Sequence, residues 1–213
     1  MFKSILLLSV IAVVVGASYL FSMVKGPDLR RYESLKKPRI TTLPDTLVLE
    51  VPFETSTDGL KNVFGFLFKT YFKIKGVPKK ASAMMPAIAR YENNLDFAME
   101  KSERAEAFKN MVWKGVAAIP LTIDLQKIPV VEHETLSARL TRWHYGETAE
   151  ILHIGPYEKE APTIQKIREF IASQGYEISG YHEEVYLRGP GLPWNRPKNY
   201  YTIIRYPVRK KSL

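Results

Sequence analysis

The sequence predicts an α+β fold in which duplicated β-α-β-β units form one curved antiparallel sheet with two helices on one face, preceded by one transmembrane helix. Three observations lead to this prediction. An uncharged run opens the chain, one order of strand and helix patterns occurs twice after it, and 46% hydrophobic with 25% charged residues is ordinary for a globular domain. With 213 residues the chain is long enough for one good-sized core or two small ones.

The first element is the apolar run Ile5 to Met23, nineteen residues without a charge. At about 1.5 Å per residue, a helix of this length spans roughly 28 Å, close to the hydrocarbon thickness of a bilayer. Lys3 and the small residues 16–18 also fit the plan of a cleaved signal peptide. The run continues beyond those small residues, so we interpret residues 1–24 as a transmembrane anchor, with a signal peptide as the alternative.

A basic segment follows, and we interpret residues 25–40 as a stalk between the membrane and the fold. It holds six lysine and arginine residues, whereas only Lys3 and the amino terminus precede the apolar run. This asymmetry predicts a single-pass membrane protein with its domain on the cytoplasmic side. Part of the formal net charge of +9 lies here and at Arg209 to Lys211, positions that suit anionic lipid headgroups, and we expect no nucleic-acid partner.

The first β-α-β-β unit begins near Thr41. Residues 46–53 have the β-branched and apolar content of a strand. From Leu60 to Phe72 apolar residues recur at i, i+3, i+4, i+7 and i+8, the pattern of an amphipathic helix. Two further strands are expected at 82–91 and 111–119.

The second unit repeats this order. Residues 148–154 are a predicted strand, an amphipathic helix follows, and two strands are expected at 178–188 and 200–208. An additional strand at 137–143 is expected to pair with 148–154 across the Tyr145-Gly146 turn. Because neither unit buries a sheet face alone, we expect them to share one curved sheet whose concave face holds a ligand.

Tyr157 is the first candidate for chemistry. It follows Gly155 and Pro156 at the junction of a strand and a helix, where glycine permits an unusual backbone and proline fixes φ for the turn. Its ring either packs at the helix entry, or its hydroxyl lines the ligand site as a donor or weak acid.

The strand Tyr181 to Leu187 carries the second set of candidates. Alternation places His182, Glu184 and Tyr186 on one face, and Glu183 with the apolar residues on the other, where it needs a paired or exposed position. If the apolar set packs on the helices, Glu184 faces the concavity. Desolvation there would raise its pKa and suit it to act as a general base or to bind a cation. An arginine or lysine against Glu184 would instead indicate a structural ion pair.

Other kinds of site lack their usual signals. The chain has no cysteine, which excludes disulfides, thiolate catalysis and cysteine-ligated metals. Its four histidines have no metal-type spacing, and neither a phosphate-binding glycine loop nor a Gly-x-Ser-x-Gly elbow occurs, so we expect no metal and no cofactor. The three tryptophans, Trp113, Trp143 and Trp194, are candidates either for the walls of a ligand cleft or for the core.

Three motifs carry a resemblance to a known family: Ala149 to Tyr157 with Glu160 after it, the strand His182 to Leu187, and Ile204 to Val208. Together they resemble the GyrI-like, or gyrase-inhibitor-like, small-molecule-binding domain family. The chain looks like a membrane-anchored member, with the GyrI-like domain at residues 41–213. The resemblance implies a pair of β-α-β-β units and an aromatic-lined cleft for bulky aromatic or cationic compounds.

The resemblance also implies roles for individual residues. Glu184 matches the glutamate at the floor of the family's cleft, and Tyr157 and Tyr186 match tyrosines near it. Some similar proteins hydrolyse electrophilic cyclopropane-containing compounds with help from this glutamate, and others only bind ligands. Glu183 stands where many members have a second histidine, and the loop 189–199 departs from the family pattern, so the identity of the ligand stays open.

Two classes of function follow. In one, the chain binds a hydrophobic or cationic small molecule, with His182 and the three tryptophans beside it, and as a hydrolase it would use Glu184 as general base in xenobiotic detoxification. In the other, the same fold serves as a membrane adaptor or receptor without catalysis. A haem-binding relative is a further alternative, because residues 66–86 resemble that family, although no axial ligand stands out.

Overall fold

The computed structural model describes residues 26–93, 111–190 and 195–212. The chain divides into two compact units. Residues 26–28 and 78–84 are the described part of one, and the other contains every helix and strand named below. The apolar run Ile5 to Met23 lies outside the described residues. Of the helices within them, none combines the length and the apolar character that crossing a bilayer requires.

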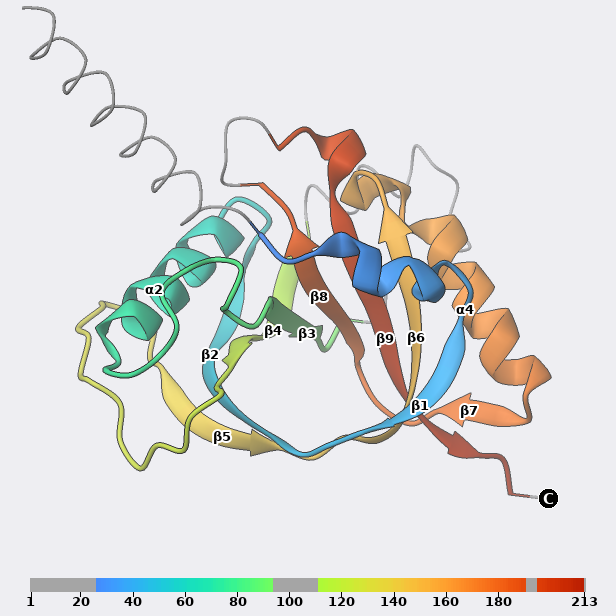
Figure 1. Ribbon diagram of the computed structural model, residues 1–213, viewed down its shortest axis with the longest axis horizontal. Coiled ribbons are helices and arrows are strands. Elements are labelled where there is room, and N and C mark those ends of the chain that lie inside the picture. The colour runs from blue at the N-terminus through green and yellow to red at the C-terminus, as the bar shows by residue number, and fades with distance from the viewer. Residues whose placement is uncertain (1–25, 94–110, 191–194, 213) are drawn as a thin grey trace, which may run out of the picture. The chain divides into compact units, whose positions relative to one another are not determined.

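Nine strands of the described chain form an antiparallel sheet in the order β1-β6-β9-β8-β3-β4-β2-β5, with β7 paired to β9 (Figure 1). The strands are β1 (Arg39–Leu43), β2 (Thr46–Ser56), β3 (Ala87–Tyr91), β4 (Val112–Pro120), β5 (Arg139–Trp143), β6 (Gly146–Ile154), β7 (Tyr176–Ile178), β8 (His182–Arg188) and β9 (Tyr201–Lys210). The helices are η1 (Leu29–Lys36), α2 (Leu60–Lys73), η2 (Tyr157–Lys159), α4 (Ala161–Ser173) and η3 (Pro197–Asn199). The predicted α+β class with a large antiparallel sheet is confirmed.

The expected repeat of two β-α-β-β units is present within the larger of the two compact parts of the chain. β2, α2, β3 and β4 form the first unit, with the sheet order β2-β4-β3. β6, α4, β8 and β9 form the second, with the matching order β6-β9-β8. β3 and β8 join the units, with Ala89 opposite Glu184 in the register. The join puts β8 in the interior of the sheet, with a neighbouring strand on each side.

The strand that precedes each unit crosses to the other unit. β5 pairs with β2 and not with β6, so the predicted hairpin across Tyr145-Gly146 is wrong; β1 correspondingly pairs with β6. Two ion pairs at equivalent places stabilise this exchange, Arg39 with Glu150 at 3.0 Å and Arg139 with Glu50 at 2.6 Å. Both glutamates are buried, and a hairpin would take Arg139 away from Glu50.

The 3-10 helix η1 runs in front of β8, β9 and β6 in Figure 1. Leu35 is buried, and Leu29 and Tyr32 pack against the same core cluster. These residues are three apart, which puts them on one face of a helix with three residues per turn. The structure therefore includes residues 29–36 of the predicted stalk in the folded unit. Because these residues recur every three positions, they do not follow the 3.6-residue period of an α-helix.

The two faces of the sheet carry different partners. On one face, three buried isoleucines of α4 pack with Ile204 of β9, and Glu184 lies opposite Ile204 in the register, so it shares this face. On the other face, Val185 and Leu187 pack with Leu35 of η1. The predicted alternation along β8 is confirmed, but its apolar residues do not pack on α4. Glu184 therefore faces the side of the sheet that carries the helix.

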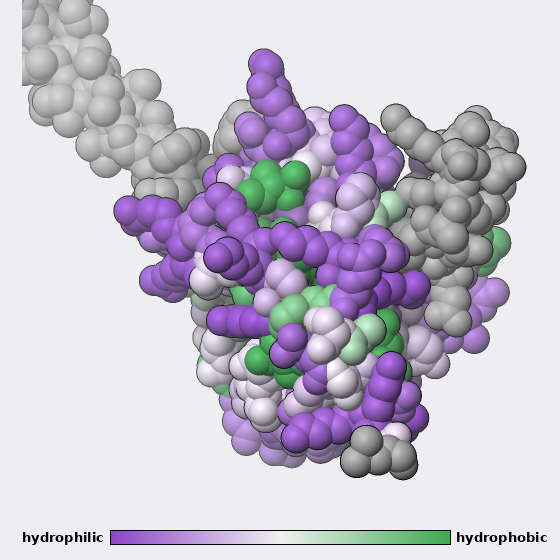
Figure 2. Space-filling view, turned by 90° about the vertical axis from the view of Figure 1, so that its right-hand side faces the viewer, coloured by the Kyte–Doolittle hydropathy of each residue, from purple (hydrophilic) through white to green (hydrophobic). Residues whose placement is uncertain are grey.

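The surface at the right-hand side of Figure 1, where α4 and β7 lie, is mainly hydrophilic, with hydrophobic side chains in small separate patches (Figure 2). The apolar stripe of α4 is buried against the sheet, and its polar stripe faces outward. α4 thus acts here as a support for the strands that carry the site.

Candidate functional site

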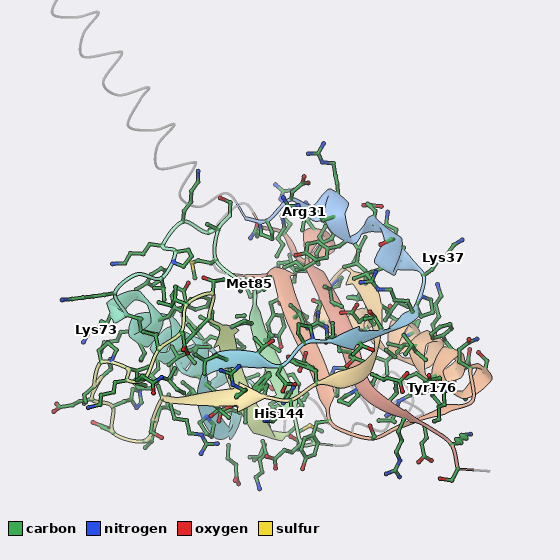
Figure 3. The ribbon with its side chains drawn as sticks, turned by 60° about the horizontal axis from the view of Figure 1, so that its bottom comes forward. Arg31, Lys37, Lys73, Met85, His144 and Tyr176 are labelled. Carbon is green, nitrogen blue, oxygen red and sulfur yellow. The ribbon has the colours of Figure 1, made fainter. Side chains whose placement is uncertain are left out.

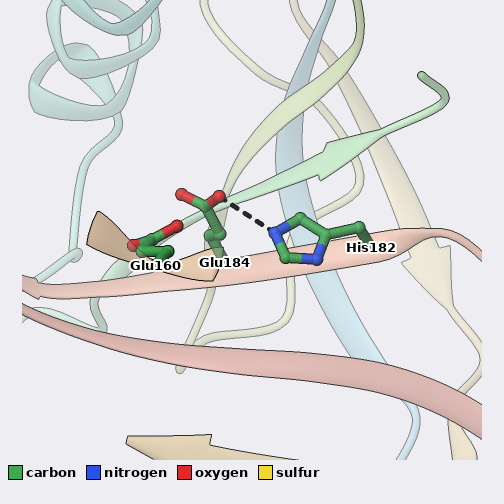
Figure 4. Close-up of side chains that lie close together, drawn as sticks. All are labelled: Glu160, His182 and Glu184. Atoms are coloured by element: carbon green, nitrogen blue, oxygen red, sulfur yellow. Dashed lines mark hydrogen bonds and ion pairs between the residues drawn. The ribbon is translucent and has the colours of Figure 1, made fainter. Parts of the chain in front are cut away.

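β8 and the start of α4 bring three ionisable side chains together. His182 and Glu184 lie two residues apart on one face of β8, and Glu160 is the residue that precedes α4 (Figure 4). One donor atom from each of the three lies within 4.8 Å of the others. The fold creates this cluster from two separate segments of the second unit.

Hydrogen bonds on both ring nitrogens fix the orientation of His182. Nε2 lies 2.9 Å from Glu184 Oε1, and Nδ1 lies 2.9 Å from the hydroxyl oxygen of Tyr206. An ionised carboxylate only accepts hydrogen bonds, so Nε2 carries a proton and donates it to Glu184. The imidazole is buried and thereby holds one carboxylate oxygen in place.

Glu184 is an ionised carboxylate with partial access to solvent. Its side chain is 12% exposed. Burial raises its pKa, but hydrogen bonds from His182, Tyr186 and Glu160 outweigh burial and hold the pKa below its ordinary value. The predicted rise of this pKa is therefore wrong, because three donors converge on the carboxylate and their positions depend on the fold.

Glu160 has the raised pKa instead. Burial, and after it the Glu184 carboxylate, raise the pKa of Glu160 well above its ordinary value, so Glu160 keeps its proton to a higher pH than an ordinary glutamate and donates a hydrogen bond to Glu184. Glu160 is 5% exposed, and its Oε1 has no hydrogen-bond partner among the described residues. Although it occupies the N-cap position of α4, its side chain makes no capping hydrogen bond. Its carboxyl group thus belongs to the cluster and not to the helix end.

Aromatic side chains surround these carboxyl groups. The hydroxyl oxygens of Tyr186 and Tyr91 are 2.7 Å apart and share a hydrogen bond, and the Tyr186 hydroxyl also acts on Glu184. Phe64 of α2 and Tyr157 of η2 both pack edge-to-face with Tyr186, at centroid distances of 5.5 and 5.9 Å. Rings from α2, β3, β8 and η2 therefore meet beside Glu184, and those of Tyr157 and Tyr186 are half-buried.

The structure brings together four of the residues that the sequence singled out, namely Tyr157, His182, Glu184 and Tyr186. Trp113 is buried one ring away, with its centroid 5.2 Å from that of Tyr91. Trp143 is part of the core on the opposite face, where the guanidinium of Arg90 lies 3.6 Å from its ring centroid, so it does not border Glu184. Trp194 lies outside the described residues.

Glu183 lies on the opposite face of β8 from Glu184 and forms ion pairs with two arginines. Its carboxylate lies 2.8 Å from Arg90 Nε, 3.3 Å from Arg205 Nη1 and 3.2 Å from the Tyr145 hydroxyl. It is 2% exposed, so of the two positions expected for Glu183, paired or exposed, it has the paired one. The groups that shift the pKa of Glu184 are instead a histidine, a tyrosine and a carboxyl group. This contrast makes Glu184 the candidate for function and Glu183 a part of the framework.

Other described histidines have different partners. His144 pairs with Asp45 at 2.6 Å in an exposed turn, where Figure 3 labels it. His153 lies 3.0 Å from the hydroxyl of Thr163, and burial lowers its pKa. In the part of the chain that the structure describes, Glu160, His182 and Glu184 are the group with donors close enough for a metal ion, one nitrogen and two oxygens.

Reasoning from the sequence does not find Glu160, Tyr91 or Tyr206 as site residues. An acidic residue just before a helix is typical of a helix N-cap, and tyrosines in strands are typical of core residues. The signal that points to Glu160 is its closeness to Gly155, whose φ of +140° confirms the unusual backbone expected there. That turn leads from β6 into η2, directly before Glu160.

Residues 139–209 match the model of the GyrI-like small molecule binding domain. A search of the curated proteins found no match. Among solved structures, an uncharacterized conserved protein from Listeria innocua gives a TM-score of 0.63 at 20% identity, with 86% of this chain and 100% of that chain covered. A hydrolase from Listeria innocua gives 0.61 at 18% identity, covering 87% and 100%. The EcmrR chain in a complex with DNA gives 0.57 at 14% identity, covering 86% and 62%.

These structures share the fold over most of this chain, well beyond the matched stretch. The expectation of no nucleic-acid partner stays a prediction, since EcmrR was solved with DNA. The stretch from β5 to β9, which contains Tyr157, Glu160, His182, Glu184 and Tyr186, is the part of the chain that matches the GyrI-like small molecule binding domain.

Proposed function

We propose that this domain binds planar aromatic cations beside Glu184. The observation that carries the proposal is an ionised, partly exposed carboxylate set among aromatic rings. A cation there is attracted by the carboxylate in surroundings less polar than water. The tyrosine rings add cation–π contacts on the order of 0.5–2 kcal/mol each. The small-molecule-binding description of the matching family model supports the same reading.

The same site suits the hydrolysis of an electrophilic compound such as a cyclopropane conjugated to a carbonyl group. Glu184 takes a proton from water while the water oxygen bonds to the electrophilic carbon. The ring bond to that carbon breaks, and its electron pair moves to the carbonyl oxygen. That oxygen then takes up the proton that Glu184 removed from water, so that one water is added in total. Burial raises the pKa of Tyr157, so its hydroxyl stays protonated and suits a hydrogen bond to that oxygen. The fold that this chain shares with a hydrolase at 18% identity supports the hydrolysis reaction only by analogy.

The binding proposal is tested with a cation and its neutral isostere. The purified full chain is expected to bind N-methyl-4-phenylpyridinium at least about tenfold more tightly than 4-methylbiphenyl, since about 1.4 kcal/mol of charge interaction is a factor of ten. Fluorescence titration measures both affinities. Equal affinities would mean that the charge of Glu184 plays no part. Incubation with an electrophilic cyclopropane compound, followed by mass spectrometry, tests for addition of one water.

Residues 5–23 are the proposed membrane anchor, with the domain on the cytoplasmic side. The support is the uncharged run and the six basic residues after it. The full chain is expected to stay with carbonate-washed membranes, and a chain lacking residues 1–24 is expected in the soluble fraction. A full chain that is extracted by carbonate would contradict the anchor.

A further inference from the structure

Glu160 has a position that neither packing nor helix capping explains. It is 5% exposed, makes no capping hydrogen bond to α4, and leaves Oε1 without a partner among the described residues. A buried carboxyl group in such a place costs stability unless it is neutral or paired. Its donor atom lies within 4.8 Å of those of His182 and Glu184. The arrangement therefore keeps a second carboxyl group at the ligand site at a cost to the fold.

Charged and titratable groups from every neighbouring element decide the charge of this pair. Those that face the cluster are Tyr91 of β3, His153 of β6, Tyr157 and Glu158 of η2, Arg168 of α4, His182, Glu184 and Tyr186 of β8, and Tyr206 of β9. Burial raises the pKa of the four tyrosines, so they stay neutral. The guanidinium of Arg168 lies over the ring of Tyr206, 5.7 Å from its centroid. His182 donates to Glu184, which leaves Glu160 to be neutralised by its own proton.

We propose that Glu160 is a second functional carboxyl group of this site, which holds a proton toward Glu184 and releases it when a ligand brings a second positive charge. The proposal rests on the proposed binding of cations. With one proton the two carboxyl groups carry one negative charge, which balances a monocation. A dication balances them only after the proton leaves, so its binding is coupled to proton release. The site then takes planar dications whose two charges are close together.

The closeness of the two carboxyl groups selects the probes. Diquat is a planar aromatic dication with its two quaternary nitrogens a few bonds apart, which fits a carboxyl pair with donor atoms within 4.8 Å. N-methyl-4-phenylpyridinium is a planar monocation of similar size. Comparing the two separates the effect of the second charge from the effect of shape. A metal chelator in all solutions keeps divalent metal ions from occupying the same three donors.

One test needs no ligand. The ordinary pKa of a glutamate is 4.5, and that of Glu160 in the fold is raised. As pH rises from 4.5 through the raised value, the unfolded chain loses this proton before the folded chain does, so the wild type loses stability. Glu160→Gln removes this slope, and the melting temperatures of the two proteins are expected to diverge as pH rises. An exposed glutamate of α4 that is not among the groups around the cluster provides the control, since Glu169→Gln should keep the wild-type slope. Parallel curves for wild type and Glu160→Gln would overturn the proposal.

The decisive test is calorimetry of the full chain in two buffers with different ionisation enthalpies, near neutral pH. Diquat is expected to release about one proton more than N-methyl-4-phenylpyridinium, and Glu160→Gln is expected to abolish that difference while the surface variant Glu169→Gln keeps it. Equal proton release for both probes would overturn the proposal and leave cation binding intact. Failure of both probes to bind would overturn the proposed function and this inference together.

Discussion

Replacing Glu183 with alanine is expected to destabilise the folded domain by about 3–5 kcal/mol, the cost of removing the buried anion that pairs with two partly buried arginines. Glu183 is 2% exposed and receives Arg90 at 2.8 Å and Arg205 at 3.3 Å. Arg205 keeps Glu150 at 2.8 Å, whereas the Nε of Arg90 loses its carboxylate partner. Chemical denaturation measures the free energy of unfolding.

An exposed pair of the same chemistry provides the control. Glu177 lies 2.6 Å from Arg209, but the two side chains are 41% and 71% exposed. Glu177→Ala is therefore expected to cost about 0–1 kcal/mol. Similar losses for Glu177→Ala and Glu183→Ala would show that the buried network contributes no more than a surface ion pair.

Periodicity predicts the helices and most strands because it is a local property. The apolar residues of α2 and α4 recur with a helical period, α2 forms within one residue of the expected bounds, and α4 follows β6 as expected. The partner of β5 is not local. Gly146 has the positive φ of a turn, which favours a hairpin with β6, yet Arg139 finds its buried partner Glu50 on β2, far away in sequence. No local pattern encodes that choice.

The candidate site is predictable in part for the same reason. Alternation along β8 separates Glu184 from Glu183 correctly, because a strand has a period of two. Which face carries the helices is a property of the whole sheet, and the apolar residue Val185 packs on the other face. Glu160 enters the site only because the second unit folds back on itself. The raised pKa of Glu160 and the lowered pKa of Glu184 both depend on the contact between these two side chains.

Replacing Glu184 with glutamine has the largest expected effect on function. The change removes the negative charge and keeps the size, and the amide oxygen still accepts from His182 Nε2. Affinity for N-methyl-4-phenylpyridinium is expected to fall by about 10- to 100-fold, while affinity for 4-methylbiphenyl stays within about threefold. If the chain hydrolyses an electrophilic compound, the loss of the general base is expected to lower turnover by about 10²–10⁴-fold.

Whether the cation binds beside Glu184 is tested most directly by the affinity of this cation and its neutral isostere for the wild type, Glu184→Gln and the surface variant Glu169→Gln, each checked for equal thermal unfolding. Of the two variants, only Glu184→Gln is expected to lose the preference for the cation. An unchanged preference in Glu184→Gln would contradict this expectation, because the cation would then bind somewhere other than beside this carboxylate.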